Sequence, residues 1–433
     1  GRRQTPAAER VVVGFIGVGG MGRATLRNFL RMPEVRVAAV CDVWEHNRAL
    51  AARITADQPG GAAEAVADFR RVLDRKDIDA VVISTPDHWH AIPTVLACEA
   101  GKDVYVEKPL AHNIREGRKM VEAARRHRRV VQMGTQQRSG EHYREAVALL
   151  REGRIGRVTR VACWNLENVT PHGIGSPADT APPPGLDWDL YLGPAPKVPF
   201  NPNRFIGTFR WFWDYAGGMM TDWGVHHIDI IHWAMDVRAP LAAAAAGGKF
   251  HLTDNRETPD TLEAVYEYPG FVMTYSHRAL NARAPWGRSY GIEFYGTDGT
   301  LFLDRGGYEI FPEAPPDWGP PEPQYLVQMR EASTPPPIQR RRLRRVARTA
   351  LAYGEGSEQN LSHIRNFLDC LKSRERPVSD VEIGHLSTAA AHLGNVAFRT
   401  GRKIRWDAEG ERVVGDEEAN RLLGREYRAP WTL

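Results

Sequence analysis

The sequence predicts an α/β domain built on a parallel sheet, followed by an α+β domain with a large, mostly antiparallel open sheet. Up to residue 134, continuous apolar runs alternate with helical patterns, which is typical of parallel strands buried on both faces. From residue 157 onward, apolar and polar residues alternate with a period of two, and turn signals such as Pro269-Gly270 separate the runs. We therefore expect a first domain at 10–134 and a second at 135–433.

The first domain should alternate strands and helices along its whole length. The expected strands are 11–19, 35–41, 80–86, 103–109 and 130–134, and the expected helices are 21–32, 44–54, 69–73, 92–100 and 114–127. In the second domain, the expected strands are 157–165, 261–268, 271–278, 291–297 and 299–304. The expected helices there are 141–152, one after Gly217-Gly218, 358–372 and 381–400, the last two packing back on the first domain. A Pro- and Arg-rich stretch near 312–350 indicates a solvated surface insertion.

Composition excludes several classes of protein. Of the 433 residues, 42% are hydrophobic and 25% are charged, as in an ordinary globular protein. Lys plus Arg exceed Asp plus Glu by only 57 − 53 = 4, which does not indicate a nucleic-acid partner. No apolar run is long enough to span a bilayer. The four cysteines lie far apart and indicate neither a disulfide framework nor a zinc site. The chain begins at Gly1, so we expect a cytoplasmic location by default and export if a leader before Gly1 has been removed.

A glycine-rich loop follows the first strand. Gly17-Val18-Gly19-Gly20-Met21-Gly22 forms a GxGxxG pattern at a strand-to-helix turn, where exposed N–H groups of a helix can bind the pyrophosphate of a dinucleotide. Asp42 ends the second strand about 20 residues on, where a carboxylate binds ribose hydroxyls. That carboxylate would repel a ribose phosphate, so the sequence favours NAD, with NADP as second choice because Arg48 is nearby.

Two further strand ends carry polar clusters, Ser84 to His90 (STPDHWH) and Glu107-Lys108-Pro109. The carboxyl ends of parallel strands line the ligand crevice of an open sheet, so we expect both clusters to surround the nicotinamide. The proline after Lys108 restricts the lysine backbone and directs its side chain, although an ordinary surface lysine is the alternative. For His90, capping of the next helix is an equally good interpretation.

The third cluster is the segment 217–229, GGMMTDWGVHHID. A helix that begins near Thr221 would bring Asp222, His226, Asp229 and Trp233 onto one face, because they are four, three and four residues apart. An amphipathic helix with a buried core histidine is the alternative.

With these three clusters together, the sequence resembles the Gfo/Idh/MocA family, the sugar and cyclitol oxidoreductases related to glucose-fructose oxidoreductase and inositol dehydrogenase. The resemblance extends from Val11 to Trp431 and rests on the motifs GVGGMG, STPDHWH, EKPL and GGxxxDxGxHxxD. The stretches GTQQRS, LDWDLYLGPAP and FRWFWDYAGG resemble a bacterial branch of the family whose members are often exported. By resemblance, we expect a Rossmann domain, NAD, a small carbohydrate or cyclitol substrate and a homodimer or homotetramer.

The resemblance implies that Lys108, Asp222 and His226 are the catalytic residues in oxidation of a secondary alcohol. Histidine has a pKa suited to accepting the hydroxyl proton near neutral pH. A helix N-terminus and Asp222 act on the imidazole in opposite directions, so we expect a ring poised near neutrality. Lys108 would hold and polarise the same hydroxyl. For Asp222, a helix cap is the alternative role.

The expected binding residues fall into two sets. For the cofactor they are Gly17, Gly19, Gly20, Met21, Gly22, Asp42, Thr85, Pro86, His88, His90, Glu107, Lys108 and Gln136. For the substrate they are Lys108, Arg210, Trp213, Asp222 and His226, since ring faces and charged donors suit a sugar. Tyr275 and His277 are further candidates, with a place in the core as the stronger interpretation.

Two other enzyme classes stay open. Some relatives in the family cleave glycosidic bonds with tightly held NAD and transient oxidation, and the segment Pro171-His172-Gly173 keeps this alternative open. A metalloenzyme is the other, because His226, His227, Asp229 and His232 all carry ligand atoms. Their spacing on a helix counts against a shared metal, and no metal is expected.

Overall fold

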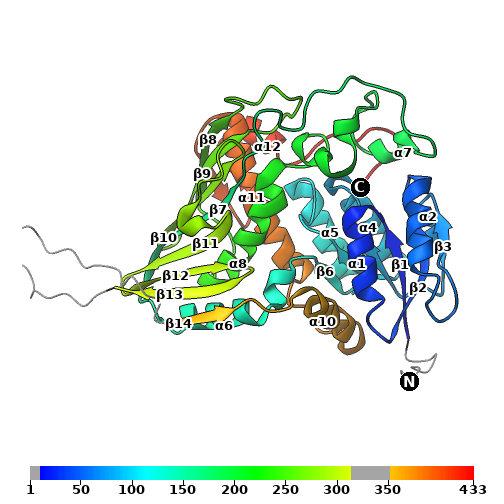
Figure 1. Ribbon diagram of the computed structural model, residues 1–433, viewed down its shortest axis with the longest axis horizontal. Helices are drawn as coiled ribbons and strands as arrows, with labels where there is room; N and C mark the ends of the chain where they lie inside the picture. The colour runs from blue at the N-terminus through cyan, green and yellow to red at the C-terminus, as the bar shows by residue number, and fades with distance from the viewer. Residues whose placement is uncertain (1–9, 314–351) are drawn as a thin grey trace, which may run out of the picture.

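Two sheets with helices between them make up the structure (Figure 1). The computed structural model describes residues 10–313 and 352–433, so the expected insertion near 312–350 lies almost wholly outside the described residues. Within those two ranges, no helix combines the length and apolar character needed to cross a membrane.

The first sheet is entirely parallel. In the described part of the chain its strand order is β3-β2-β1-β4-β5-β6, the order of a Rossmann fold. The strands are β1 (Val11–Ile16), β2 (Val35–Cys41), β3 (Glu64–Val66), β4 (Ala80–Ile83), β5 (Asp103–Val106) and β6 (Val131–Met133). Its helices are α1 (Gly20–Phe29), α2 (Glu45–Ile54), α3 (Arg70–Asp74), α4 (Ala91–Glu99) and α5 (Ile114–Arg126).

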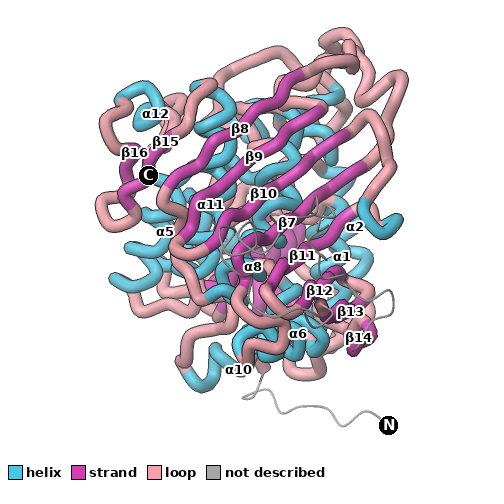
Figure 2. The backbone as a smooth tube through the Cα atoms, turned by 90° about the vertical axis from the view of Figure 1, so that its left-hand side faces the viewer, coloured by secondary structure: helices cyan, strands magenta, loops and turns pink. Residues whose placement is uncertain are grey.

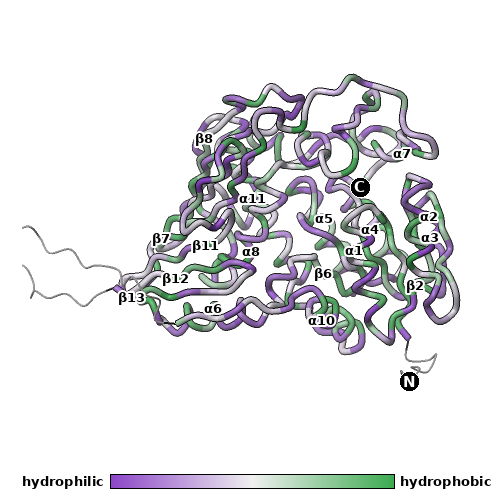
Figure 3. The backbone as a smooth tube through the Cα atoms, in the orientation of Figure 1, coloured by the Kyte–Doolittle hydropathy of each residue, from purple (hydrophilic) through white to green (hydrophobic). Residues whose placement is uncertain are grey.

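Apolar burial explains these strands. Every residue of β4 and β5 is buried, because helices cover both faces of the sheet. Figure 3 shows the corresponding hydrophobic stretches where this sheet and its helices pack. Local signals set the helix ends: Asn113 caps α5 by accepting a hydrogen bond from the Glu116 N–H at 3.0 Å. The α/β part of the fold therefore agrees with the sequence.

The second sheet is large and mostly antiparallel. Among the described residues its order is β14-β13-β12-β11-β7-β10-β9-β8-β15-β16. The strands are β7 (Val158–Leu166), β8 (Ala242–Gly248), β9 (Thr261–Tyr268), β10 (Phe271–Arg278), β11 (Tyr290–Gly296), β12 (Gly299–Asp304), β13 (Gly307–Pro312), β14 (Ala352–Glu355), β15 (Ile404–Asp407) and β16 (Arg412–Val413). One pairing departs from the antiparallel pattern, since β7 and β10 run parallel at the centre of the sheet.

Among the described residues, helices cover only one face of this sheet. They include α6 (Glu141–Arg151), α8 (Val225–Met235) and α11 (Val381–Thr400). Figure 2 faces the other side and shows no helix in front of the strands. On that side, Val265 of β9 and Val272 of β10 are 42% and 40% exposed. The sheet is thus open on one face, as expected.

The chain after β14 returns to the first sheet. The ring of Phe367 in α10 (Asn360–Ser373) packs against Phe29 of α1 and Tyr105 of β5, with centroids 6.4 and 5.8 Å apart. Arg374, just after α10, pairs with Asp103 at 2.6 Å. The other α-helices of the described residues are the short α7 (Trp188–Leu192) and α12 (Glu417–Arg421).

Candidate active site

The glycine-rich loop after β1 needs glycine at two places for steric reasons. Gly17 has φ +83°, and a Cβ there would lie 2.6 Å from the backbone nitrogen of Thr85. A Cβ on Gly22 would lie 2.1 Å from the carbonyl oxygen of Gly17. By contrast, a Cβ on Gly19 or Gly20 would meet nothing within 4 Å. Gly17 and Gly22 therefore close the turn, whereas Gly19 and Gly20 leave the backbone open to a ligand.

A cavity of about 310 Å³ lies over this loop at the carboxyl ends of the strands. Of the residues expected to bind the cofactor, Gly17, Gly19, Gly20, Met21, Asp42, Thr85, Pro86, Glu107 and Lys108 line it. Gly22, His88, His90 and Gln136 do not. The outer wall comes from residues 205–210, far along the chain. There, Ile206 has φ +41° and Gly207 φ +27°, and a β-branched residue with positive φ marks a strained backbone.

Asp42 is fixed at one end of the cavity. Its Oδ1 accepts a hydrogen bond from the Trp44 N–H at 2.9 Å, and its Oδ2 accepts one from the Val18 N–H at 3.0 Å. Burial raises the pKa of this carboxyl, and these N–H groups oppose the rise. Arg48 donates to the backbone oxygen of Asp42, at 2.7 Å. The position suits the adenosine ribose of a dinucleotide, and the open backbone at Gly19 and Gly20 suits its pyrophosphate, so the residues present fit NAD.

The two histidines of the STPDHWH segment have backbone partners. His88 Nε2 lies 2.9 Å from the carbonyl oxygen of Tyr191. His90 Nδ1 lies 2.7 Å from the carbonyl oxygen of Pro109, and its Nε2 lies 2.9 Å from that of Thr85. Burial lowers the pKa of His90 to about 4. His90 thus ties the β4 end to the segment that carries Lys108, behind the cavity wall instead of in it.

The segment's cavity-lining carboxyl belongs to Asp87, which the sequence analysis placed in this polar cluster without assigning it a binding role. Burial raises the pKa of Asp87 to about 7, although Arg210 and Lys108 oppose this rise. The signal that would have identified it is its place in the motif, one residue beyond Pro86 at a strand end.

Lys108, Asp222 and Arg210 form a cluster of charges at the edge of the cavity. Lys108 Nζ donates to Asp222 Oδ1 at 2.6 Å and to the backbone oxygen of Asp222 at 2.7 Å. Arg210 Nε donates to the same Oδ1 at 2.8 Å. Burial alone would raise the pKa of Asp222, but the charges of Lys108 and Arg210 outweigh it and hold the pKa well below its ordinary value. Asp222 is therefore ionised.

Asp222 lies in a π-helical turn, Met220–Gly224, which continues into α8. The expected single helical face shared by Asp222 and Asp229 was therefore wrong, because a π turn accommodates an extra residue and rotates the side chains before it relative to those after it. Asp222 contacts Lys108 and Arg210, whereas Asp229 contacts Arg138 on another side. Tyr275 supports the turn, since its hydroxyl donates to the Met219 carbonyl oxygen at 3.1 Å.

His226 lies one turn after Asp222 and is 3% exposed. Its Nδ1 is buried without a hydrogen-bond partner among the described residues. Burial, together with the positive charges of Lys108 and Arg305, holds the pKa of His226 well below its ordinary value, and Asp222 opposes this only weakly. The expected balance near neutrality was wrong, because desolvation outweighs the effect of the carboxylate. The imidazole is neutral at pH 7.

Other candidate side chains lie elsewhere. The Trp213 ring packs against Phe398, with centroids 6.5 Å apart, and lies 5.1 Å from the guanidinium of Arg399, both from α11. His277 Nδ1 lies 3.1 Å from the carbonyl oxygen of Asn165, so His277 joins β10 to β7.

The histidines and Asp229 of α8 have separate partners. His227 Nε2 lies 3.1 Å from Asn165 Oδ1, and His232 Nε2 lies 2.8 Å from the Tyr268 hydroxyl. Asp229 forms a buried ion pair with Arg138 at 2.6 Å. No group of three or more His, Cys, Asp or Glu side chains suited to a metal ion occurs in the described residues. These contacts favour structural roles for the three side chains.

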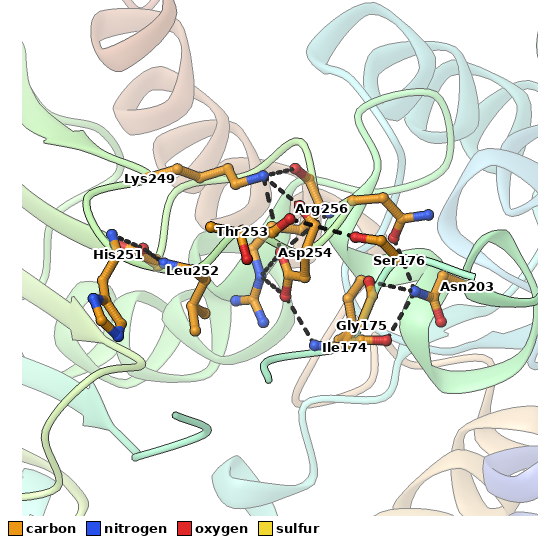
Figure 4. Close-up of polar contacts among 12 residues, drawn as sticks. Ile174, Gly175, Ser176, Asn203, Lys249, His251, Leu252, Thr253, Asp254 and Arg256 are labelled. Atoms are coloured by element: carbon orange, nitrogen blue, oxygen red, sulfur yellow. Dashed lines mark hydrogen bonds and ion pairs between the residues drawn. The ribbon is translucent and has the colours of Figure 1, made fainter. Parts of the chain in front are cut away.

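The loop that contains Pro171-His172-Gly173 is held by a buried ion pair (Figure 4). Asp254 Oδ2 accepts hydrogen bonds from the Ile174 N–H and from Arg256 Nε, both at 2.8 Å. Arg256 in turn lies over the ring of Trp211, 5.2 Å from its centroid. Since Trp211 follows Arg210, this arrangement fixes the segment that forms the outer wall of the cavity.

Comparison with protein families agrees with this geometry. The model described as "Oxidoreductase family, NAD-binding Rossmann fold" (GFO_IDH_MocA) matches residues 11–135, and the family's C-terminal alpha/beta domain matches 162–251 and 355–433. The chain belongs to the Gfo/Idh/MocA family. It is therefore an oxidoreductase with an NAD-binding Rossmann fold, as its resemblance implied.

Individual relatives in the Gfo/Idh/MocA family differ in how much of the chain they match. The uncharacterized oxidoreductase YrbE of Bacillus subtilis is 24% identical over 303 residues, 69% of this chain and 74% of that relative. Glycosyl hydrolase family 109 protein 1 of Shewanella sp. (strain MR-4) is 33% identical over 157 residues, 35% of this chain. The matched part spans only 34% of that relative's length.

Solved structures of the family have the same fold over most of the chain. Levoglucosan dehydrogenase in complex with NADH and levoglucosan superposes with a TM-score of 0.63 at 20% identity, covering 92% of this chain and 99% of that one. The WlbA dehydrogenase from Bordetella pertussis, in complex with NADH and UDP-GlcNAcA, gives 0.63 at 17% identity with the same coverage.

Proposed function

We propose that this family member is an NAD-dependent dehydrogenase that oxidises a secondary alcohol of a sugar or cyclitol. The observation that supports it most is the Lys108–Asp222 contact. It joins a residue of the cavity wall to the helix that carries His226. The carbohydrates in the levoglucosan dehydrogenase and WlbA structures support the substrate class.

Bound NAD would supply the hydride acceptor. The loop Gly17–Gly22 and the N-terminus of α1 would hold its pyrophosphate, and Asp42 its adenosine ribose. A ribose phosphate would meet the Asp42 carboxylate, so NAD should bind more tightly than NADP. Measured dissociation constants for the two dinucleotides test this preference, and tighter binding of NADP would contradict it.

Different residues of the chain act on the proton and on the oxygen of the substrate hydroxyl. As the alcohol C–H bond breaks and hydride leaves, the neutral imidazole of His226 accepts the hydroxyl proton. Lys108 donates a hydrogen bond to the same oxygen and stabilises its developing negative charge. Asp222 balances the charges of Lys108 and Arg210 and fixes the lysine side chain. The products are a ketone, a protonated His226 and the reduced cofactor.

The chain divides into a cofactor domain at 10–134 and a substrate and oligomerisation domain at 135–433. We place the contact between subunits on the uncovered face of the large sheet, where apolar side chains such as Val265 and Val272 are exposed. A homodimer or homotetramer is the expected assembly, and its mass in solution can be measured by light scattering.

The decisive experiment is a screen of sugars, cyclitols and aryl glycosides with the purified protein. NADH absorbance and released aglycone are recorded in the same reactions. Steady NADH formation with a free polyol or aldose supports the dehydrogenase. No NADH formation with any member of the panel would contradict it.

A second candidate is a glycosidase that oxidises its substrate only transiently. The glycosyl hydrolase family 109 relatives favour it, since they match this chain at 32–33% identity, although over little more than a third of it. Such an enzyme would release aglycone without net NADH.

A further inference from the structure

Arg305 lies beside the candidate active site, and no acidic side chain among residues 10–313 and 352–433 forms an ion pair with it. It lies in the turn between β12 and β13, and its guanidinium lies over the ring of Trp223, 4.5 Å from the centroid. Its Nε is buried without a hydrogen-bond partner. By contrast, Arg288 near the same hairpin pairs with Asp304. A partly buried guanidinium without a counter-ion is costly unless a ligand pairs with it.

The position of Arg305 links it to the reacting groups. The Trp223 ring lies edge-on to the His226 imidazole, with centroids 5.9 Å apart, and 4.9 Å from the Tyr290 ring. Trp223, Tyr290 and Arg305 are all partly exposed, so a ligand can reach them. Lys108 and Arg305 are the two cations whose charges act most strongly on His226. The imidazole therefore lies in a positive field that an anionic substrate would enter favourably.

The chemistry of these side chains selects a ligand class. A guanidinium presents parallel N–H donors that match the two oxygens of a carboxylate. The faces of Trp223 and Tyr290 suit the C–H surface of a pyranose ring. On the basis of the proposed function, we infer that Arg305 binds the carboxylate of an acidic sugar, of the hexuronate class, while a ring hydroxyl of that sugar faces Lys108 and His226.

A carboxylate suits this site better than a phosphate. Phosphate groups are usually bound by several donors, including backbone N–H groups at a helix N-terminus. Arg305 projects from a hairpin turn. Its positive charge acts to lower the pKa of four nearby rings, those of Tyr143, Tyr290, His226 and His227. One guanidinium beside tyrosines balances a single negative charge.

Direct binding measurements test the inference without turnover. The full chain, saturated with NADH, is titrated calorimetrically with glucuronate and galacturonate, and with the matched neutral sugars glucose and galactose. We expect one hexuronate to bind at least about tenfold more tightly than its neutral partner, and Arg305→Gln to remove that preference. Arg305→Lys should keep part of this preference, because lysine retains the positive charge but lacks the paired N–H donors of the planar guanidinium.

Arg288→Gln is the matched control, since Arg288 lies near the same hairpin but already pairs with Asp304 and Glu309. It should leave the preference unchanged, and NADH affinity reports whether each variant is folded. Equal binding of hexuronate and hexose, an unchanged preference in Arg305→Gln, or stronger binding of glucose 6-phosphate would overturn the inference. Arg305-dependent hexuronate binding without NADH formation from NAD would instead contradict only the proposed function.

Discussion

Lys108 and Asp222 are 114 positions apart in the chain, yet the lysine Nζ contacts both the carboxylate and the backbone oxygen of the aspartate. This double contact joins the end of a Rossmann strand to a π-helical turn below the second sheet. It fixes the ammonium group at the edge of the cavity and links the Rossmann domain to the turn that precedes His226.

Replacing Lys108 by alanine should lower kcat/KM on the order of 10²–10³-fold, the usual loss when a donor to a developing oxyanion is removed. NAD affinity should change little. Steady-state kinetics and a fluorescence titration with NADH measure the two effects. Lys197→Ala, at an exposed lysine, is the control. Near-normal turnover in Lys108→Ala would rule out the proposed role.

Replacing His226 by alanine should lower kcat by about 10²–10⁴-fold, as expected for loss of a general base. The ring is buried next to Trp223 and Asp222, so unfolding curves of the variant must accompany the kinetics. His251→Ala should be silent, because His251 is exposed in a surface loop. If His226→Ala keeps its stability and its turnover, the proton has another acceptor.

The glycines of the cofactor loop should separate folding from binding. Gly17→Ala forces a side chain onto φ +83° and against the Thr85 backbone, so it should lower the free energy of unfolding. Gly19→Ala meets nothing within 4 Å, so it should leave stability intact. Its methyl group would nevertheless hinder the pyrophosphate and weaken NAD binding about tenfold or more, ~1.4 kcal/mol. Equal effects of both variants on stability would contradict this division.

Asp87 should make stability depend on pH. Burial raises the pKa of Asp87 to about 7 in the folded chain, against the opposing charges of Arg210 and Lys108 and with support from Asp222. The folded state then binds more protons than the unfolded state between about pH 4 and pH 7, so the free energy of unfolding falls as pH rises through this window. Asp87→Asn removes this contribution.

Unfolding curves at pH 5, 6 and 7 measure the effect of Asp87. The variant should gain stability over the natural protein as pH rises, and the gain should level off above pH 7. A constant difference between the two proteins at all three pH values would show that Asp87 is ionised throughout.

Asp229 should be structural instead of catalytic. It forms an ion pair with Arg138 in which both side chains are buried, so Asp229→Ala leaves a buried, unpaired charge. The expected cost is about 3–5 kcal/mol of unfolding free energy, measured by denaturant titration. Replacing both partners with apolar residues should restore much of it. A loss of activity without a loss of stability would indicate a ligand role for Asp229.

Much of the fold was predictable from patterns local in sequence. Except for the short, mostly exposed β3, the Rossmann strands were predicted because burial on both faces leaves long apolar runs. Gly17, Asp42 and Lys108 were predicted because ligands meet such sheets at strand ends. Both predictions need only the order of residues along the chain.

Features that depend on distant contacts were missed. The π turn at Met220–Gly224 is invisible to a pattern that assumes one helical period. The parallel pairing of β7 with β10 depends on how strands are connected in space. His88 and His90 were expected in the cavity, but each lies within hydrogen-bond distance of a backbone carbonyl oxygen, that of Tyr191 for His88 and that of Pro109 for His90. Arg305 lies in no motif, and Trp223 lies in the 217–229 segment without an assigned role, so the contact between their side chains could not be predicted from sequence.

Residues 205–210 have a consequence for how long the dinucleotide stays bound. They form the outer wall of the cavity, although they lie far beyond the first sheet in the sequence. A fragment that ends after β6 would therefore lack this wall. Outward movement of this wall would widen the cavity for entry and departure of the cofactor. The strained backbone at Ile206 would lower the free-energy cost of that movement, whereas the ion pair between Arg210 and Asp222 would raise it. We therefore expect retention of the dinucleotide between turnovers to depend on this short stretch of chain outside the sheet that binds it.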